Sequence, residues 1–242
     1  MKRSKSTLIV MCGGRGSRMG EKTKELPKPL VVVDGRPMLD HILRNLDRFI
    51  SGDLVLATGY KAEAIDDFIK GREFNFNSLT LSNSGLNTSM LKRLYDVKDK
   101  LTPLNLVCYG DTFIDIDYVK LIKELEEDDG ALATMVTGKI RNPFGIIKVD
   151  EEEGLVTSFE EKPLLNYYIG SFVFKKSAFD LIDQELLDLP DGEGLVLLFK
   201  KLVNLKKLKF YAHEGLNISF NTQDEHRVAE QHLRDYYTVE EG

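Results

Sequence analysis

The residues best placed to do chemistry follow an apolar run near the start of the sequence. Residues 6–11 (Ser-Thr-Leu-Ile-Val-Met) predict a buried strand, and residues 12–19 (Cys-Gly-Gly-Arg-Gly-Ser-Arg-Met) come directly after it. A glycine-rich loop that leaves such a strand lets backbone N–H groups approach an anion closely. Arg18 in the loop and Lys28 after it place two positive charges beside that anion. We therefore expect a site for the triphosphate of a nucleotide. Its predicted contacts in the loop are Gly13, Gly14, Gly16 and Ser17.

A second candidate is an aspartate at the end of another predicted buried strand. Residues 104–109 (Leu-Asn-Leu-Val-Cys-Tyr) form that strand, and Gly110 and Asp111 follow it. An aspartate in this position can hold Mg²⁺ against phosphate oxygens, because Mg²⁺ usually takes one or two carboxylates and keeps its waters. The alternative is an aspartate that caps a helix, and Asp117 is better placed for that role. Asp111 is therefore a predicted metal ligand.

The glycine-rich loop differs from the commoner phosphate-binding motifs. It lacks G-x-x-x-x-G-K-[ST], and Met19 stands where the last glycine of G-x-G-x-x-G would be. The pattern Gly-Gly-x-Gly-Ser/Thr-Arg-Met/Leu, followed by Pro27-Lys28-Pro29, instead resembles the signature of the sugar-nucleotide pyrophosphorylases, which transfer nucleotides to sugar 1-phosphates. The resemblance covers essentially residues 6–235. It is nearest to the glucose-1-phosphate cytidylyltransferase branch in residues 20–23, 58–61, 91–94, 109–111 and 212–215.

This resemblance implies an enzyme that joins a nucleoside triphosphate to a sugar 1-phosphate and releases pyrophosphate. Both reactants are anions, so the main tasks are neutralising charge and aligning the reacting atoms. Arg18 matches the arginine of the family loop, and Lys28 matches the family lysine that contacts the nucleotide phosphates. We expect both residues to be catalytic, Mg²⁺ to be the cofactor, and CTP and glucose 1-phosphate to be the favoured substrates.

The second metal ligand is where the sequence departs from the family. The family usually carries an aspartate in a strand-to-helix turn near its C-terminus, and Asn221 takes that place here. An amide oxygen still ligates Mg²⁺ but contributes no charge, so weaker metal binding is expected. The alternative is that Asn221 only caps the last helix. Asp111 and Asn221 are together the expected metal ligands.

The sugar phosphate is expected to bind at a third motif. Residues 159–163 (Phe-Glu-Glu-Lys-Pro) match the family segment in which a lysine grips the sugar phosphate and the preceding glutamate accepts hydrogen bonds from sugar hydroxyls. The resemblance therefore implies a catalytic role for Lys162 and sugar binding by Glu161. Gly145 is expected to approach the sugar through its backbone, and Asn166 to continue the pocket. For the neighbouring Tyr167, core packing is an equal alternative.

The base of the nucleotide is expected near residues 84–88 (Ser-Gly-Leu-Asn-Thr). In the family, a glycine and its polar neighbours in this stretch contact the base, which implies Gly85 and Thr88 here. Thr88 could instead cap the helix that follows. The glycine-rich triplet of the cytidylyltransferase branch is absent at this point, and the chain contains no tryptophan. These departures leave the base and the sugar open.

The elements that must position these residues follow from the apolar patterns. Strand-like and helix-like segments alternate as far as about residue 130, which predicts a Rossmann-like α/β fold whose mostly parallel sheet is flanked by helices. Residues 53–58 predict a second buried strand, and helical spacing of apolar residues predicts helices around 42–49 and 118–125. Ligands of such sheets bind beyond the C-terminal ends of the strands. The glycine loop and Asp111 both fall there.

From about residue 131 the pattern changes to shorter, β-branched and aromatic runs. These predict an additional mixed or antiparallel portion with strands at residues 132–137, 144–149, 155–159, 168–174 and 208–212, and helices at 177–183, 194–203 and 222–236. We expect a single nucleotidyltransferase domain over residues 1–242. Its nucleotide-binding half would end at about residue 130, and its sugar-phosphate-binding half would span about 131–242.

Composition limits the classes of partner. The chain has 242 residues, 42% apolar content and a net charge of −6, with basic and acidic residues interspersed, so nucleic-acid binding is not expected. Two cysteines without metal-ligand spacing suggest buried thiols in a reducing compartment. The apolar run after the basic start is too short for a signal peptide or a membrane span. We expect a cytoplasmic protein without membrane partners, and homo-oligomers are possible.

Two alternatives to this function remain at the level of sequence. One keeps the chemistry and changes the base or acceptor, as in a guanylyl-, thymidylyl- or uridylyltransferase acting on another sugar or polyol phosphate. The other is a catalytically weak, nucleotide-sugar-binding regulatory protein, which Asn221 alone favours. Arg18, Lys28, Asp111 and Lys162 are all present, which argues against loss of activity.

Overall fold

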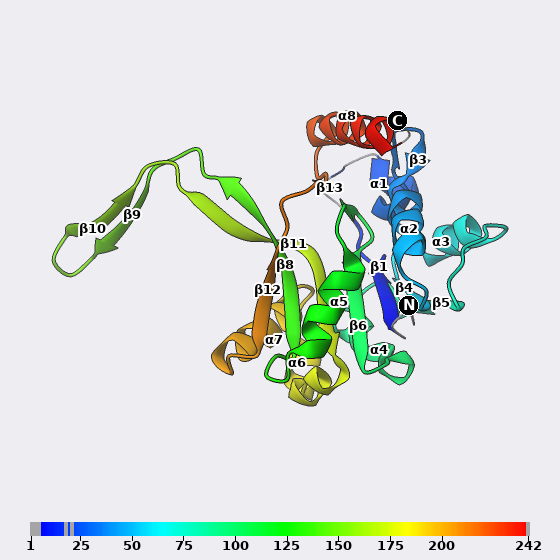
Figure 1. Cartoon of the computed structure of the whole chain (residues 1–242), viewed down its shortest axis with the longest axis horizontal. Coiled ribbons are helices and arrows are strands. Elements are labelled where there is room, and N and C mark those ends of the chain that lie inside the picture. Colours follow the sequence, from blue (N-terminus) through cyan, green and yellow to red (C-terminus); the bar gives the residue numbers. More distant parts are fainter. Residues whose placement is uncertain (1–5, 17–18, 20–21, 241–242) are drawn as a thin grey trace.

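A seven-stranded sheet forms the centre of the computed structural model, which describes residues 6–16, 19 and 22–240. Its order is β12-β8-β11-β6-β1-β4-β5 (Figure 1). Neighbouring strands are parallel except β11, which is antiparallel to both β6 and β8. The predicted mostly parallel sheet is therefore confirmed. The strands are β1 (Thr7–Met11), β4 (Asp53–Thr58), β5 (Ser78–Asn83), β6 (Leu104–Tyr109), β8 (Ala133–Arg141), β11 (Leu164–Lys175) and β12 (Leu208–Ala212).

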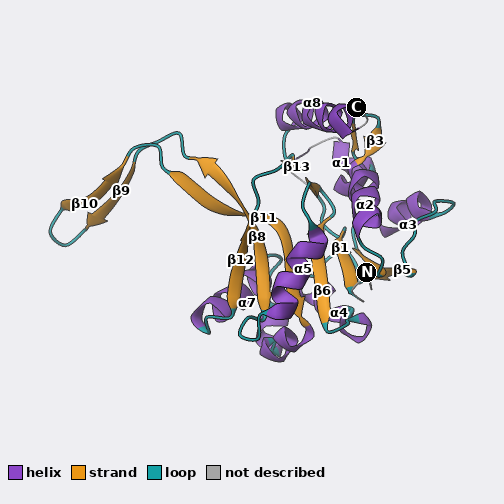
Figure 2. Ribbon diagram, in the orientation of Figure 1, coloured by secondary structure: helices purple, strands orange, loops and turns teal. Residues whose placement is uncertain are grey.

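Both faces of this sheet are covered by helices, which is why its central strands are mostly apolar (Figure 2). In β1, Leu8 and Val10 point into one core and Ile9 points into the other. The first core is closed by α2 (Met38–Phe49), α3 (Ala62–Ile69), α5 (Tyr118–Glu127) and α8 (Gln223–Glu240). The second is closed by α4 (Met90–Asp96), α6 (Gln184–Asp188) and α7 (Glu193–Asn204).

Local signals set several helix starts. Asp117 caps α5 by accepting a hydrogen bond from the backbone N–H of Lys120 at 2.9 Å, as its position predicts. The predicted helix at 177–183 is wrong in type: it is a 3₁₀ helix, η4 (Lys176–Leu181). The predicted segment ends at Asp183, which instead caps a separate helix, α6, by accepting from the N–H of Leu186. Short helical segments are α1 (Lys22–Glu25), η2 (Lys28–Leu30) and η3 (Lys98–Lys100).

Two small strand pairs lie outside the central sheet, and one of them joins distant parts of the chain. The pair β2 (Val32–Val33) and β3 (Arg36–Pro37) is a local turn before α2. The pair β7 (Thr112–Ile114) and β13 (Asn217–Ser219) is antiparallel, with Phe113 opposite Ile218. This second pairing places the turn after β6 next to the segment that enters α8. Within the described part of the chain, no helix has the length and apolar character needed to cross a membrane.

An arm extends from one side of the body. It comprises the outer halves of β8 and β11 together with the hairpin β9 (Ile146–Asp150) and β10 (Leu155–Glu160), and Figure 1 shows it projecting well beyond the sheet. Four apolar residues share one face of the hairpin, because Ile147 pairs with Phe159 and Val149 with Val156. All four are exposed, Phe159 by 66%. The acidic run at 151–153 lies in the solvent-exposed turn of the hairpin.

Candidate active site

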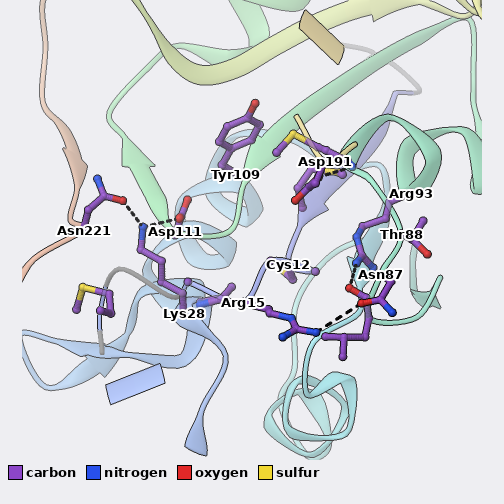
Figure 3. Close-up of a pocket in the computed structure, with 18 residues that line it drawn as sticks. Cys12, Arg15, Lys28, Asn87, Thr88, Arg93, Tyr109, Asp111, Asp191 and Asn221 are labelled. Carbon is purple, nitrogen blue, oxygen red and sulfur yellow. Dashed lines mark hydrogen bonds and ion pairs between the residues drawn. The ribbon is translucent and has the colours of Figure 1, made fainter. Parts of the chain in front are cut away.

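A pocket of about 600 Å³ opens beyond the C-terminal ends of β1 and β6 (Figure 3). This is the position that a parallel α/β sheet favours for ligands. Residues from widely separated segments line it: Met11, Cys12, Gly13, Gly14, Arg15, Gly16, Met19, Lys28, Pro29, Leu86, Asn87, Thr88, Met90, Arg93, Tyr109, Asp111, Asp191 and Asn221. The pocket thus collects most of the described residues that were predicted to bind the nucleotide and the metal.

The glycine-rich loop forms one wall of the pocket. Its path is fixed by backbone hydrogen bonds, including Cys12 N–H to the carbonyl of Ala57 (2.8 Å) and Tyr60 N–H to the carbonyl of Gly13 (3.1 Å). Gly14 is exposed and no atom lies within 4 Å of its Cβ position, so the loop is open on this side. Gly16 has a φ of +61°, a conformation that favours glycine. The predicted contacts Ser17 and Arg18 lie outside the described residues.

Lys28 lies at one end of the pocket, where it joins two other predicted site residues. It begins η2 directly after Pro27 and is only 7% exposed. Its ammonium donates to Oδ2 of Asp111 at 2.7 Å and to Oδ1 of Asn221 at 3.2 Å. Figure 3 shows the three side chains converging. The structure therefore brings together three of the predicted site residues, from three segments far apart in the sequence.

Asp111 and Asn221 present oxygens to the same cation, which is the donor chemistry that Mg²⁺ prefers. Gly110 lets Asp111 sit at the strand end, because a Cβ at Gly110 would lie 2.8 Å from the sulfur of Cys12 and 3.0 Å from the carbonyl of Met11. No group of three His, Cys, Asp or Glu side chains that could hold a metal occurs among the residues described. A metal ion at this corner would therefore depend on Asp111, Asn221 and the ligand's own phosphates.

The structure separates the two roles that the sequence left open for Asn221. The side chain that caps the start of α8 is that of Thr222, whose hydroxyl accepts from the N–H of Glu225 at 3.2 Å. Asn221 instead directs its amide oxygen at Lys28, and its backbone N–H donates to Glu225 at 2.6 Å. The same distinction holds for Thr88, because the cap of α4 is Ser89. Thr88 lines the pocket and its hydroxyl donates to the carbonyl of Ser84.

Arg93 and Asp191, at the other end of the pocket, were not identified as site residues from the sequence. Arg93, on α4, is 4% exposed and its guanidinium donates to the carbonyls of Thr58 (2.6 Å) and Leu86 (3.4 Å). Burial lowers the pKa of Arg93. Arg93 stands two residues after Leu91 and one before Leu94, so helical spacing does not place it on their shared face and the sequence pattern did not predict its burial. Nothing local distinguishes Asp191, which lies in an ordinary Pro-Asp-Gly turn.

Burial favours the neutral forms of Cys12 and Tyr109, which line the pocket, and of Cys108, which lies on β6 outside it. Burial, with a smaller contribution from Asp111, raises the pKa of the Cys12 thiol far above its usual range. Burial also raises the pKa of the Cys108 thiol to about 11 and raises that of the Tyr109 hydroxyl. None of these groups is suited to serve as an anionic nucleophile at neutral pH.

The predicted sugar-phosphate residues lie elsewhere. Gly145, Glu161 and Lys162 belong to the arm, and none of them lines the pocket. Gly145 packs beside Phe159 and Glu161, since a Cβ there would lie 2.9 Å and 3.0 Å from their side chains. Asn166 lies in the outer part of β11, opposite Lys139. The structure thus does not bring this group together with Lys28, and its role in sugar binding stays a prediction.

The predicted base segment is only partly at the pocket. Gly85 does not line the pocket, whereas Leu86 and Asn87 do.

Tyr167 is not a core residue. Its side chain is 37% exposed, and its hydroxyl donates to Oδ1 of Asn217 at 3.0 Å. Through this bond the base of the arm touches β13, four residues before Asn221. The alternative of core packing for Tyr167 is therefore wrong.

Gly59 offers a test of how tightly the pocket wall is packed. A Cβ at Gly59 would lie 2.1 Å from Nη1 of Arg93, and the guanidinium cannot retreat because Gly13 lies against it on another side and two carbonyls hold it. We expect Gly59→Ala to lower the free energy of unfolding by about 1–3 kcal/mol, as overpacking does. Urea unfolding measures this. Gly14→Ala is the matched control, because no atom lies within 4 Å of its Cβ position. Equal stabilities of the two variants would contradict the packing described.

Comparisons with known proteins agree with this geometry. The sequence profile of the family described as "Nucleotidyl transferase" matches residues 7–213. The chain is 29% identical over 237 residues to a Bacillus subtilis protein named "Probable glucose-1-phosphate cytidylyltransferase", covering 88% of this chain and 91% of that one. It is 33% identical over 157 residues to the D-glycero-alpha-D-manno-heptose 1-phosphate guanylyltransferase of Campylobacter jejuni, covering 64% and 67% of the two chains.

Among solved structures, HddC from Yersinia pseudotuberculosis has the same fold. Its TM-score is 0.69 at 20% identity, over 94% of this chain and 99% of that one. The family match spans the glycine loop, Lys28 and Asp111, which are the residues the structure gathers around one pocket. On this match the chain belongs to the nucleotidyl transferase family.

Proposed function

We propose that the protein is a sugar-1-phosphate nucleotidyltransferase that requires Mg²⁺. The observation that carries the proposal is the corner formed by Lys28, Asp111 and Asn221 beside a glycine-rich loop in the same pocket. Binding and aligning a polyphosphate requires an ammonium group, a carboxylate and open backbone N–H groups of this kind. The relatives from Bacillus subtilis and Campylobacter jejuni act, by their names, on sugar 1-phosphates.

The reaction is a single displacement at phosphorus. An oxygen of the sugar phosphate forms a bond to the α-phosphorus of the triphosphate, the bond from that phosphorus to the bridging oxygen breaks, and pyrophosphate leaves with the electron pair. No proton transfer by the protein is needed at the reacting oxygen, since both groups are already anionic. Lys28 would hold phosphate oxygens and neutralise their charge. The loop at residues 12–16 would position the phosphates through its backbone.

The donor set fits a magnesium ion with one protein carboxylate. Asp111 and Asn221 would hold the ion, which when bound would supply charge neutralisation on the phosphates. Because the amide of Asn221 is uncharged, we expect the metal to bind firmly only together with the nucleotide. CTP and glucose 1-phosphate are the substrates we favour, in keeping with the name of the Bacillus subtilis relative.

The sugar phosphate needs cations of its own. Lys162 and Glu161 are our candidates, with Gly145 and Asn166, but in this structure the arm holds Gly145, Glu161 and Lys162 outside the pocket. They would reach a pocket only if the arm bends at its base or if another copy of the chain supplies them. Self-association of the chain stays a prediction, and the exposed apolar face of the arm is the observation that favours it.

A pyrophosphate-release assay tests the proposal. CTP, UTP, GTP, dTTP and ATP are each combined with a panel of sugar 1-phosphates in the presence of Mg²⁺. We expect release only when one triphosphate and one sugar phosphate are present together, and loss of release when EDTA exceeds the metal. Release from a triphosphate alone would contradict the transferase. No release in any combination, with tight binding of a nucleotide-sugar by calorimetry, would favour the regulatory alternative.

A further inference from the structure

A second polar cluster lies at the end of the pocket opposite Lys28. In Figure 3, Arg93, Asp191, Asn87 and Thr88 stand together on one side, and Lys28 with its partners stands on the other. If the phosphates bind at the glycine loop and at the Lys28 end of the pocket, the base of the same nucleotide would lie against this second cluster. A role for the cluster in choosing the base therefore rests on the proposed function.

Arg93 supplies donors at this end. A guanidinium carries five N–H groups, and the two carbonyls that Arg93 contacts use only part of that capacity. Among the residues described, Arg93 forms no ion pair within 4.0 Å, although it is almost fully buried. The charges of Asp191 and Asp96 favour the charged guanidinium without an ion pair at contact distance, so donor groups of Arg93 remain for an acceptor oxygen of a bound ligand.

Asp191 supplies an acceptor at the same end. It lies in the turn between α6 and α7, and its Oδ1 accepts from the backbone N–H of Met90 at 2.8 Å, at the start of α4. This bond fixes the carboxylate in place. Asp191 lines the pocket, and its charge acts on Arg93. The second oxygen therefore remains for a ligand, and a carboxylate oxygen takes hydrogen bonds only from donors.

We propose that Asp191 and Arg93 select the base, with Asp191 accepting from an exocyclic amino group and Arg93 donating to a carbonyl oxygen. Cytosine and guanine carry both groups. Adenine has no carbonyl for Arg93. Uracil and thymine have no amino group, and their single ring N–H is flanked by two carbonyl oxygens that a carboxylate repels. The site is thus assigned to CTP or GTP, against UTP, dTTP and ATP.

The test compares base preference in the wild type and in Asp191→Asn. Asparagine keeps an oxygen for the N–H of Met90 but adds a donor that can face a carbonyl, so the fold should be retained while the preference is lost. The ratios of kcat/KM for CTP over UTP and for GTP over ITP are measured. ITP lacks only the 2-amino group of GTP, whereas UTP has a carbonyl and a ring N–H in place of the amino group and bare ring nitrogen of CTP. We expect the wild type to favour the amino-bearing base of its preferred pair by at least about 10-fold. We expect the same ratio in Asp191→Asn to fall to within about threefold of unity.

The control variant is Asp188→Asn. Asp188 is an exposed carboxylate on α6 that contacts Gln184, and its removal should leave the ratios unchanged. A wild type that prefers UTP, dTTP or ATP would overturn the proposal, and so would an unchanged ratio in Asp191→Asn. If no combination releases pyrophosphate, the proposed function fails. Base preference is then read from the nucleotide-induced rise in melting temperature, which decides the role of Asp191 by the same comparison.

Discussion

Replacing Lys28 with methionine is expected to lower kcat for pyrophosphate release by about 100- to 1000-fold. Methionine keeps most of the length and apolar stem of the side chain, which is buried, but removes the ammonium that faces Asp111 and Asn221. Without the ammonium, no buried cation at this end of the pocket stabilises the negative charge that develops on the leaving pyrophosphate. Steady-state kinetics with saturating Mg²⁺ and both substrates measures the loss.

The control for this variant is Lys123→Met on α5. Lys123 is exposed and its ammonium pairs with Glu127 at 3.5 Å on the surface of the same helix. We expect its kcat to match that of the wild type. Thermal unfolding should be little changed in Lys28→Met, because Asp111 is 29% exposed and can be hydrated once its partner is gone. A kcat for Lys28→Met within threefold of the wild type would exclude Lys28 from the chemistry.

Replacing Asp111 with asparagine is expected to weaken the use of Mg²⁺ by the enzyme. The substitution preserves an oxygen for Lys28 but leaves the corner with two amide oxygens and no carboxylate. We expect the Mg²⁺ concentration for half-maximal activity to rise at least about 10-fold, and kcat at saturating metal to fall by about 100-fold. Titrating Mg²⁺ against pyrophosphate release gives both numbers.

Asp129→Asn is the matched control for the metal, since Asp129 is an exposed carboxylate in the turn after α5. Its metal requirement should equal that of the wild type. An Asp111→Asn protein with an unaltered Mg²⁺ titration would show that the metal, if one is needed, binds without this carboxylate. Loss of activity with no change in the titration would assign Asp111 to holding Lys28 rather than to the ion.

The sequence predicted the inner strands of the central sheet well because they are buried on both faces. Residues 53–58 and 104–109 form β4 and β6 with the predicted bounds. The edge strand β12 is mostly exposed, and it was predicted at 208–212 because its aromatic residues favour a strand. By contrast, β5 (Ser78–Asn83) was not predicted. It is an edge strand, half-exposed, in which polar residues alternate with leucines. An edge strand contributes little to the core, so its apolar signal is weak.

The residues of the candidate site also fall into a predicted group and a group that was not predicted. Lys28 and Asp111 carry local motifs, and the structure places both at one corner. Asp191 has no such motif and joins the pocket only because the α6–α7 turn packs against the start of α4. The hairpin strands β9 and β10 were predicted, but the outer halves of β8 and β11 and the departure of the arm from the body were not. Alternating apolar residues at 146–160 indicate a sheet with one covered face and leave the covering partner unspecified.

The corner at Lys28 also has a consequence for how the protein folds. Its two hydrogen bonds join positions that are 83 and 193 residues apart in the chain. Contacts of such separation form late, because the entropy of closing long loops must be overcome first. A chain with its helices formed but its distant segments undocked would therefore have no such corner. Recovered enzymatic turnover is accordingly a stricter sign of the native state than recovered helical signal.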